Sequence, residues 1–237
     1  MENGRAIVIG ASSGIGRCVA QRFIQGGWTV GVAARRTELM ADLGAKVVAE
    51  IDVTAEDSPQ RLQKLITDLG GMDLFFYAAG VGRQNLELAE SVELQTVETN
   101  GMGFTRMVGE AYRWMVQEGK GHIACISSIA GTKGLGMAPS YSATKAFQNC
   151  YLEALQQQAR MRGAKVFITD IRPGFVDTPL LHHTYPLMMQ PDDVAKKIVR
   201  AIKKRRAVVV IDGRWRLITW LWRLIPHCLW RRMRVGK

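Results

Sequence analysis

The stretch RAIVIGASSGIGRCVAQRF, residues 5–23, decides the fold. In it a β-branched run ends at three glycines, Gly10, Gly14 and Gly16, and a helix-like segment follows. Glycine lets the main chain turn sharply and approach a ligand closely, and the following helix N-terminus attracts an anion. The stretch predicts a phosphate-binding turn between a strand and a helix. The alternative is a turn that only needs flexibility, because G-x-x-x-G-x-G differs from the dinucleotide fingerprint G-x-G-x-x-G.

Apolar runs alternate with helix-like segments along the chain. Strands that are apolar on both faces and separated by helices indicate a parallel sheet covered on both sides. Right-handed crossovers then give a doubly wound, Rossmann-type α/β fold in one domain, with ligands at the carboxyl ends of the strands. The expected strands are 6–10, 29–34, 46–53, 73–80, 122–127, 165–171 and 207–211, and the expected helices are 14–26, 57–69, 101–118, 141–162 and 192–205.

The composition of the 237-residue chain indicates a globular protein. Hydrophobic residues make up 47% of it, which excludes a disordered chain. We expect no secretory signal, because the first strand begins almost at once. The four cysteines, at positions 18, 125, 150 and 228, lack metal-ligand spacing. We therefore expect free thiols in a reducing cytoplasm and no metal site.

Residues 126–145 place a serine, a tyrosine and a lysine at a regular spacing. Ser128 ends a strand, Tyr141 follows thirteen residues later, and Lys145 lies four residues beyond Tyr141. A spacing of four puts Tyr141 and Lys145 on one helix face, where an ammonium would lower the pKa of the phenol. Such a phenol can give or take a proton near neutral pH. The alternative is an ordinary helix start.

Two further stretches bear on the site. Asn100 lies at the start of an expected helix, where it is either a functional residue or an N-cap. Residues 170–179 form a strand end, a Pro173-Gly174 turn and a loop in which Thr178 is placed to bond a ligand amide; the alternative is a plain strand, turn and loop.

Together these residues resemble the short-chain dehydrogenase/reductase family over residues 5 to about 179. The serine-to-tyrosine interval and the string YSATK are specific, and the motifs occur in the expected order. In chain order, the family's glycine motif matches Gly10, Gly14 and Gly16, its asparagine Asn100, its catalytic serine Ser128, its Tyr-x-x-x-Lys motif Tyr141 and Lys145, and its Pro-Gly motif Pro173 and Gly174.

The resemblance implies a carbonyl–alcohol oxidoreductase with a nicotinamide cofactor. Tyr141 would exchange a proton with the substrate oxygen, and Ser128 would hydrogen-bond that oxygen. Lys145 would hold the nicotinamide ribose, and Asn100 would hold a water that links Lys145 to solvent. The cofactor-binding residues we expect are Gly10, Ser12, Ser13, Gly14, Ile15, Gly16, Arg35, Arg36, Asp52, Val53, Ala79, Gly80, Tyr141, Lys145, Pro173, Gly174, Val176 and Thr178.

Three positions depart from the family pattern. Ile9 stands where the family usually has Thr, and Cys125 stands where Asn often occurs. Tyr77-Ala78-Ala79-Gly80 stands where the family usually has Asn-Asn-Ala-Gly. These changes remove side-chain hydrogen bonds that brace the end of the sheet. Backbone contacts to a cofactor can survive them.

Arg35 and Arg36 indicate the choice of cofactor. They follow the second strand, where a carboxylate would bind the ribose 2′-OH of NAD and an arginine would accommodate a 2′-phosphate. No carboxylate precedes Glu38 in this segment, and a guanidinium fits phosphate geometry. The sequence therefore predicts NADP, the alternative being two solvated arginines. Asp52 and Val53 match the family's adenine-contacting pair.

Residues 213–237 depart from the body, residues 1–212, in charge. They hold seven basic residues, no acid and four of the six tryptophans. The longest uncharged stretch is too short to span a bilayer, so we expect a kinked amphipathic helix on an anionic membrane surface, with Trp215, Trp220, Trp222 and Trp230 at the headgroups. On a helix Arg216, Thr219, Arg223, His227, Arg231 and Arg234 share one face, and Leu217, Ile218, Leu221, Leu224, Ile225 and Leu229 share the other, with the kink at Pro226.

Alternatives to the membrane are packing on the body or another subunit and, ranked last, nucleic acid, which we do not expect. We expect an NADP-dependent reductase or dehydrogenase in the cytoplasm, peripheral to the inner face of a membrane. The apolar loop 134–139 and a lid over 180–189 indicate a hydrophobic, lipid-like carbonyl or alcohol; His182 and His183 belong to the lid surface.

The resemblance implies a homodimer or homotetramer through helices 101–118 and 141–162. The alternative of another class is a non-catalytic, membrane-associated NADPH-binding scaffold.

Overall fold

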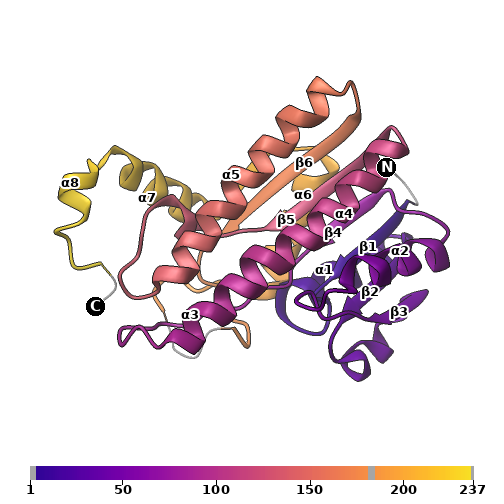
Figure 1. Cartoon of the computed structure of the whole chain (residues 1–237), viewed down its shortest axis with the longest axis horizontal. Helices are drawn as coiled ribbons and strands as arrows, with labels where there is room; N and C mark the ends of the chain where they lie inside the picture. Colours follow the sequence, from indigo (N-terminus) through magenta and orange to yellow (C-terminus); the bar gives the residue numbers. More distant parts are fainter. Residues whose placement is uncertain (1–3, 181–184, 236–237) are drawn as a thin grey trace.

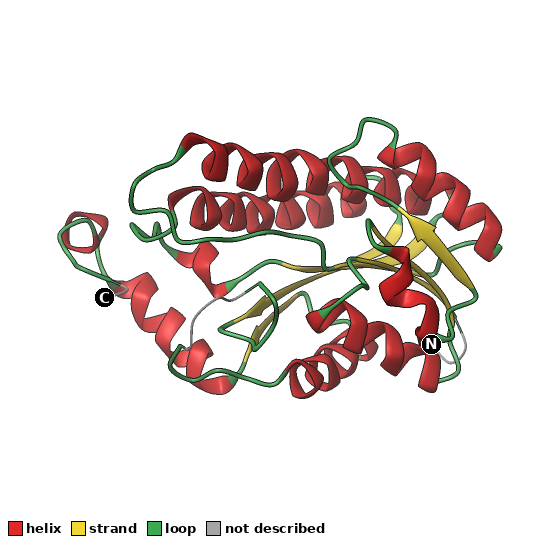
Figure 2. Cartoon of the chain, turned by 90° about the horizontal axis from the view of Figure 1, so that it is seen from below, coloured by secondary structure: helices red, strands yellow, loops and turns green. Residues whose placement is uncertain are grey.

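A parallel sheet of seven strands lies between two layers of helices in the computed structural model, which describes residues 4–180 and 185–235 (Figures 1 and 2). The strand order is β3-β2-β1-β4-β5-β6-β7, and every neighbouring pair is parallel. The doubly wound fold is thus confirmed. The strands are β1 (Arg5–Ile9), β2 (Thr29–Ala34), β3 (Val47–Glu50), β4 (Leu74–Tyr77), β5 (Lys120–Ile126), β6 (Lys165–Pro173) and β7 (Val208–Ile211).

The helices divide between the two faces of the sheet. Helices α1 (Gly14–Gln25) and α6 (Pro191–Lys203) cover one face, and α2 (Ser58–Leu69), α4 (Phe104–Gln117) and α5 (Pro139–Met161) cover the other. The remaining elements are α3 (Glu90–Val97), α7 (Gly213–Leu224), α8 (His227–Trp230), the short 3-10 helices η1 (Thr37–Leu43) and η3 (Ile129–Thr132), and the π-helical η2 (Glu98–Gly103). Within the described ranges, no helix is long and apolar enough to cross a bilayer.

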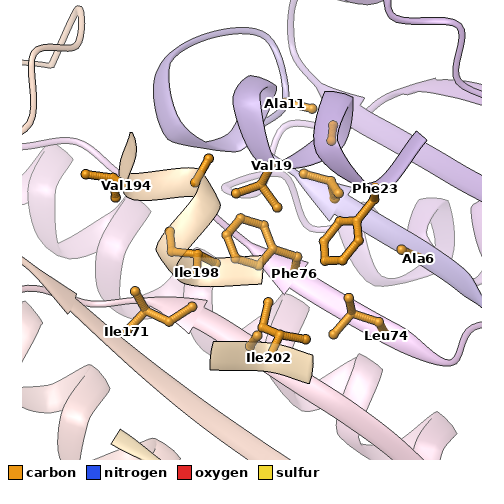
Figure 3. Close-up of a cluster of buried hydrophobic side chains, with 14 of the residues drawn as sticks. Ala6, Ala11, Val19, Phe23, Leu74, Phe76, Ile171, Val194, Ile198 and Ile202 are labelled. Atoms are coloured by element: carbon orange, nitrogen blue, oxygen red, sulfur yellow. The ribbon is translucent and has the colours of Figure 1, made fainter. Parts of the chain in front are cut away.

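The core beneath α1 and α6 fixes the direction in which α1 leaves the sheet. Val19 and Phe23 of α1 meet Ile198 and Ile202 of α6 over Phe76 of β4 (Figure 3), and all five side chains are buried. Full burial of such a side chain stabilises the folded state by about 1.5–3 kcal/mol relative to leaving it exposed. This packing holds the N-terminus of α1 at the carboxyl edge of the sheet.

Apolar packing replaces side-chain hydrogen bonds at the end of β4. Tyr77 is fully buried, its ring meets Phe104 edge to face with centroids 5.4 Å apart, and it pairs in register with Cys125 of β5. Among the described residues the Tyr77 hydroxyl has no hydrogen-bond partner. The departures noted in the sequence therefore coincide with a strand end held by aromatic and aliphatic contacts.

Asn100 is not an N-cap. The helix begins eleven residues before the expected start, at Glu90, and runs through α3, η2 and α4 to Gln117, with Asn100 inside the π-helical turn. At Gly103 a Cβ atom would lie 2.9 Å from the carbonyl oxygen of Val53, so glycine is required there by close packing.

The C-terminal segment is not one kinked amphipathic helix. Helix α7 ends at Leu224, the separate short helix α8 begins after Pro226, and both project beyond the sheet at one end of the molecule (Figure 1). Trp215 and Trp230, expected at lipid headgroups, are only 6% and 7% exposed. Trp215 belongs to the core under α6, and Thr219, assigned to the cationic face, is buried as well.

Candidate active site

The glycine turn after β1 is built for close approach of the main chain. Gly10 and Gly14 have positive φ angles of +84° and +53°, which side chains rarely adopt. A Cβ on Gly16 would lie 2.1 Å from the carbonyl oxygen of Gly10, and one on Gly10 would lie 2.6 Å from the Ala79 nitrogen. The turn therefore admits no side chain at Gly10 or Gly16, and α1 begins at Gly14 with its N-terminus at the edge of the sheet.

A cavity of about 1010 Å³ opens beside this turn. It lies at the carboxyl ends of the strands, where the order reverses between β1 and β4, the usual ligand position in such sheets. Of the site residues expected from the sequence, all except Asn100 line it. These are Gly10, Ser12, Ser13, Gly14, Ile15, Gly16, Arg35, Arg36, Asp52, Val53, Ala79, Gly80, Ser128, Tyr141, Lys145, Pro173, Gly174, Val176 and Thr178.

Ser128, Tyr141 and Lys145 meet on one wall of the cavity. Ser128 follows β5 and caps η3, where its Oγ accepts a hydrogen bond from the Ala130 nitrogen at 3.1 Å. Tyr141 and Lys145 lie one turn apart on α5, with the Lys145 Nζ 5.7 Å from the centre of the Tyr141 ring. A residue of α3 fixes the N-terminus of α5: the Glu93 carboxylate accepts a hydrogen bond from the Ser140 nitrogen at 3.0 Å.

Burial raises the pKa of Tyr141, and the neighbouring Ser128 hydroxyl partly offsets that rise. This corrects the expectation that Lys145 lowers it. The Lys145 ammonium donates its hydrogen bonds to the Ile126 carbonyl at 3.2 Å and to Gln148 at 3.0 Å. Burial also lowers the pKa of Lys145 itself to about 8, although the carboxylate of Asp170 acts in the opposite direction.

Gln148 joins the two residues between which a water was expected. Its Oε1 accepts from Lys145, and its Nε2 donates to the main-chain carbonyl of Asn100 at 2.9 Å. The Asn100 side chain is engaged elsewhere: its Oδ1 accepts from the Val81 nitrogen at 2.9 Å and its Nδ2 donates to the Val81 carbonyl at 2.7 Å. Asn100 thus supports the wall from behind the cavity, and its water relay stays a prediction.

A buried ion pair lies behind Lys145. Asp170 and Arg172 share one face of β6, and the guanidinium meets the carboxylate at 2.7 Å. The Ser127 hydroxyl donates to the other carboxylate oxygen. The Asp170 carboxylate raises the pKa of Lys145, but burial lowers it more.

The sequence model of the short chain dehydrogenase family matches residues 5–186. The chain is a short-chain dehydrogenase. Its family membership accounts for the order of the glycine turn, Ser128 and the Tyr141–Lys145 pair along the chain.

Relatives and solved structures agree with this membership. A protein of Myxococcus xanthus named an uncharacterized oxidoreductase is 31% identical, with 97% of each chain covered. An NADP-dependent 3-hydroxy acid dehydrogenase of Escherichia coli is 31% identical over 72% of this chain and 71% of its own. A short chain dehydrogenase from Burkholderia cenocepacia, solved in complex with NADP, has a TM-score of 0.87 at 21% identity, with 99% of both chains covered; that likeness shows the fold.

The residues of this short-chain dehydrogenase fit a nicotinamide dinucleotide. The turn at Gly10 and Gly16 forms a cradle that Cβ atoms would fill. Arg35 and Arg36 follow β2, beside the turn, because the Gly10 nitrogen donates to the Ala33 carbonyl at 2.8 Å. Both line the cavity and are exposed, and no ion pair of either is found among residues 4–180 and 185–235. Burial acts to raise the pKa of Asp52, but hydrogen bonds from Thr54 hold it below its usual value. Asp52 is therefore a carboxylate that already has partners.

The sequence analysis missed the residues that helix α7 brings to the dehydrogenase cavity. Trp215, Trp222 and Val235 line it, together with Phe175 and Tyr185. A Cβ on Gly174 would lie 2.2 Å from the Trp215 Nε1 atom, so the Pro-Gly turn leaves room for this indole. The helical spacing of the tryptophans was visible, but which face of α7 turns inward was not. His182 and His183 lie outside the described residues.

Proposed function

We propose that this short-chain dehydrogenase is an NADP(H)-dependent oxidoreductase that interconverts a carbonyl and an alcohol on a hydrophobic substrate. The observation that carries the proposal is the meeting of Ser128, Tyr141 and Lys145 on one wall of the cavity that begins at the glycine turn. A positioned proton donor, a hydroxyl and an ammonium are the groups that polarise a carbonyl oxygen.

Each side chain has a distinct role in this proposal. A bound nicotinamide supplies or accepts the hydride, which is chemistry that the protein does not perform. Tyr141 gives its phenolic proton to the carbonyl oxygen during reduction. Ser128 donates a hydrogen bond to the same oxygen, where negative charge develops. Lys145 holds the ribose beside Tyr141 with its ammonium.

The raised pKa of Tyr141 favours the reductive direction. Burial keeps this phenol protonated at neutral pH, and a protonated phenol is the form that donates to a carbonyl oxygen. The oxidative direction needs the phenolate, which forms at higher pH. We therefore expect faster reduction than oxidation near neutrality.

Two features support NADP and an apolar substrate. Arg35 and Arg36 line the cavity where a 2′-phosphate would lie, and the E. coli relative is named for its NADP dependence. The part of the cavity beyond Tyr141 is bordered by aliphatic, aromatic and thioether side chains, which suit an apolar carbonyl compound. These are Leu135, Met137, Phe175, Leu180 and Trp222.

The test of the reaction is Tyr141→Phe, assayed with NADPH against a panel of apolar ketones and aldehydes. Loss of the proton donor should lower kcat by about 10²–10⁴-fold, while NADPH affinity, followed by fluorescence, changes little. Tyr112→Phe is the matched control, because Tyr112 is also buried but does not line the cavity. If both variants reduce the carbonyls at the wild-type rate, the mechanism is wrong. Tight NADPH binding without turnover by the wild type would instead indicate a scaffold.

A further inference from the structure

Helix α7 has two apolar faces. The inner face packs on the body through Trp215, Ile218 and Trp222. On the opposite side, four large apolar residues follow the i, i+3, i+4, i+7 spacing of one helix face and are 48–61% exposed. We call these four, with two exposed apolar residues of the segment after them, the outer tail face: Leu217, Trp220, Leu221, Leu224, Leu229 and Met233.

The direction of the outer tail face is fixed by the body. The Lys133 ammonium donates to the Ile225 carbonyl at 3.0 Å, at the end of α7. The Trp230 Nε1 donates to the Gly134 carbonyl at 2.7 Å, and the Trp230 ring packs against Trp222 with centroids 5.4 Å apart. The tail is thus attached at several points, and its exposed apolar side chains point away from the protein.

Positive charge surrounds the outer tail face. Arg216 and Arg223 flank the apolar stripe of α7 on one side and Arg214 on the other, and Arg231, Arg232 and Arg234 follow α8. All six are exposed. The nearest acid in the sequence, Asp212, caps α7 and pairs with Arg214 at 2.8 Å. The charge of this surface is therefore nearly uncompensated.

An occupant of this surface must be apolar and anionic at once. A second copy docked face to face would bring the five arginines other than Arg214 against the same five, and such like-charge contacts cost several kcal/mol at an interface. A nucleic acid would satisfy the arginines but leave the aliphatic side chains without a partner. The interface of an anionic lipid bilayer supplies both parts, because acyl chains receive leucine and tryptophan while headgroups receive arginine.

We propose that the outer tail face docks this protein in the plane of an anionic lipid bilayer. The docking does not rest on the proposed reaction. It has a geometrical consequence for the cavity, because the inner side of the same helix forms cavity wall at Trp222. Docking places that wall against the lipid interface, so that an apolar substrate can pass from bilayer to cavity.

The experiment is sedimentation of the full chain with vesicles of phosphatidylcholine alone or of equal parts phosphatidylcholine and phosphatidylserine. The full chain is needed because truncation after Asp212 would remove Trp215 from the core. We expect binding to the anionic vesicles only, weakened by salt. Arg216→Gln/Arg223→Gln should reduce the partition coefficient roughly 10-fold or more, and Trp220→Ser/Leu224→Ser should reduce it comparably.

Matched controls come from other exposed sites. Lys196→Gln/Lys197→Gln removes two exposed cations from α6, and Leu86→Ser/Met161→Ser removes two exposed apolar side chains; both should bind as the wild type does. NADPH binding in every variant verifies the fold. Equal binding to neutral vesicles, no binding to either kind, or equal losses in the controls would overturn the proposal. So would a fall in the light-scattering mass of Trp220→Ser/Leu224→Ser with vesicle binding unchanged.

Discussion

The ammonium of Lys145 donates a hydrogen bond to the Oε1 of Gln148 at 3.0 Å, three residues further along α5. The other end of the Gln148 amide donates to the main chain of the π-helical turn at Asn100. Gln148 is completely buried, so this bond forms in a medium where hydrogen bonds to charged groups are worth about 1.5–3 kcal/mol. Gln148 thus acts as a positioning residue that sets the direction of the Lys145 ammonium.

We expect substitutions of Gln148 to shift the alkaline limb of the activity profile. The Lys145 ammonium holds its charge below its pKa of about 8, so activity that needs the charge should fall as the pH rises through that value. Gln148→Leu removes a stabilising acceptor and should move this limb to lower pH. Gln148→Glu adds an anionic acceptor and should move it to higher pH. The check is kcat/KM against pH for the three proteins.

The two Gln148 variants control for each other. A purely structural role would lower activity in both without moving the limbs in opposite directions. Limbs that coincide with the wild-type limb would show that Gln148 does not tune Lys145.

Replacement of Arg35 and Arg36 by alanine should weaken NADPH binding and spare NADH. Each guanidinium lost removes a charge-assisted contact to the 2′-phosphate, worth about 1.5–3 kcal/mol, so affinity should fall at least roughly 10-fold. Fluorescence titration of both cofactors measures the ratio. Lys196→Ala/Lys197→Ala, which lowers the net charge equally outside the cavity, is the control. Equal wild-type affinity for NADH and NADPH would contradict the NADP assignment.

His122 should make the folded state sensitive to acid. Burial lowers its pKa to about 4 from 6.5, and its Nδ1 has no partner among the described residues. Because the folded-state pKa is depressed, the contribution to stability is complete above pH 6.5 and is lost as the pH falls towards 4. The loss should reach ~3 kcal/mol, at about 1.36 kcal/mol per pH unit.

The measurement is the free energy of unfolding in urea across this pH range for the wild type and His122→Gln. The amide of glutamine can keep the hydrogen bond to the Thr169 hydroxyl, which His122 makes at 2.8 Å, but it does not titrate. The variant should therefore lose less stability than the wild type on acidification. Parallel curves would show that another group governs the acid response.

The resemblance implied a dimer or a tetramer, and from the exposed face of α5 we expect a dimer. Leu152 and Leu155 of this helix are buried on the sheet and are not part of the exposed face. Phe147 is 43% exposed and stacks on Tyr151 with centroids 5.6 Å apart. Phe147→Arg should thus halve the mass seen by light scattering. Met161→Arg, at the 85% exposed end of the same helix, should leave it unchanged. A wild-type monomer in dilute solution would refute the prediction.

The body of the fold could be predicted because its signals are local. Each strand is apolar on both faces, and the sheet order follows from right-handed crossovers. The placement of Gly10, Tyr141 and Lys145 at the cavity follows in turn. The doubly wound fold was confirmed, and these three residues line the cavity.

The sequence could not show which face of α7 packs on the body, or which residues far apart in the chain contact each other. The two sides of α7 are similarly apolar, and only the space left at Gly174 shows that Trp215 turns inward. The bond from Glu93 to Ser140 joins residues 47 positions apart. Lys145 and Gln148 were close enough in sequence to be paired, as i and i+3 of one helix, yet a buried glutamine carries no motif.

The π-helical turn makes the length of one segment inflexible. Between Glu93, which holds the start of α5, and Asn100, which holds the loop at Val81, the chain is helical throughout. Removing or adding a single residue there would rotate one anchor about 100° relative to the other. Flexible surface loops tolerate insertions and deletions, because the free energy of closing a loop changes little with its length. Here a length change would break either the contact of Glu93 with the start of α5 or the contact of Asn100 with the cavity wall at Val81. Engineered variants should therefore keep the number of residues between 93 and 100 unchanged.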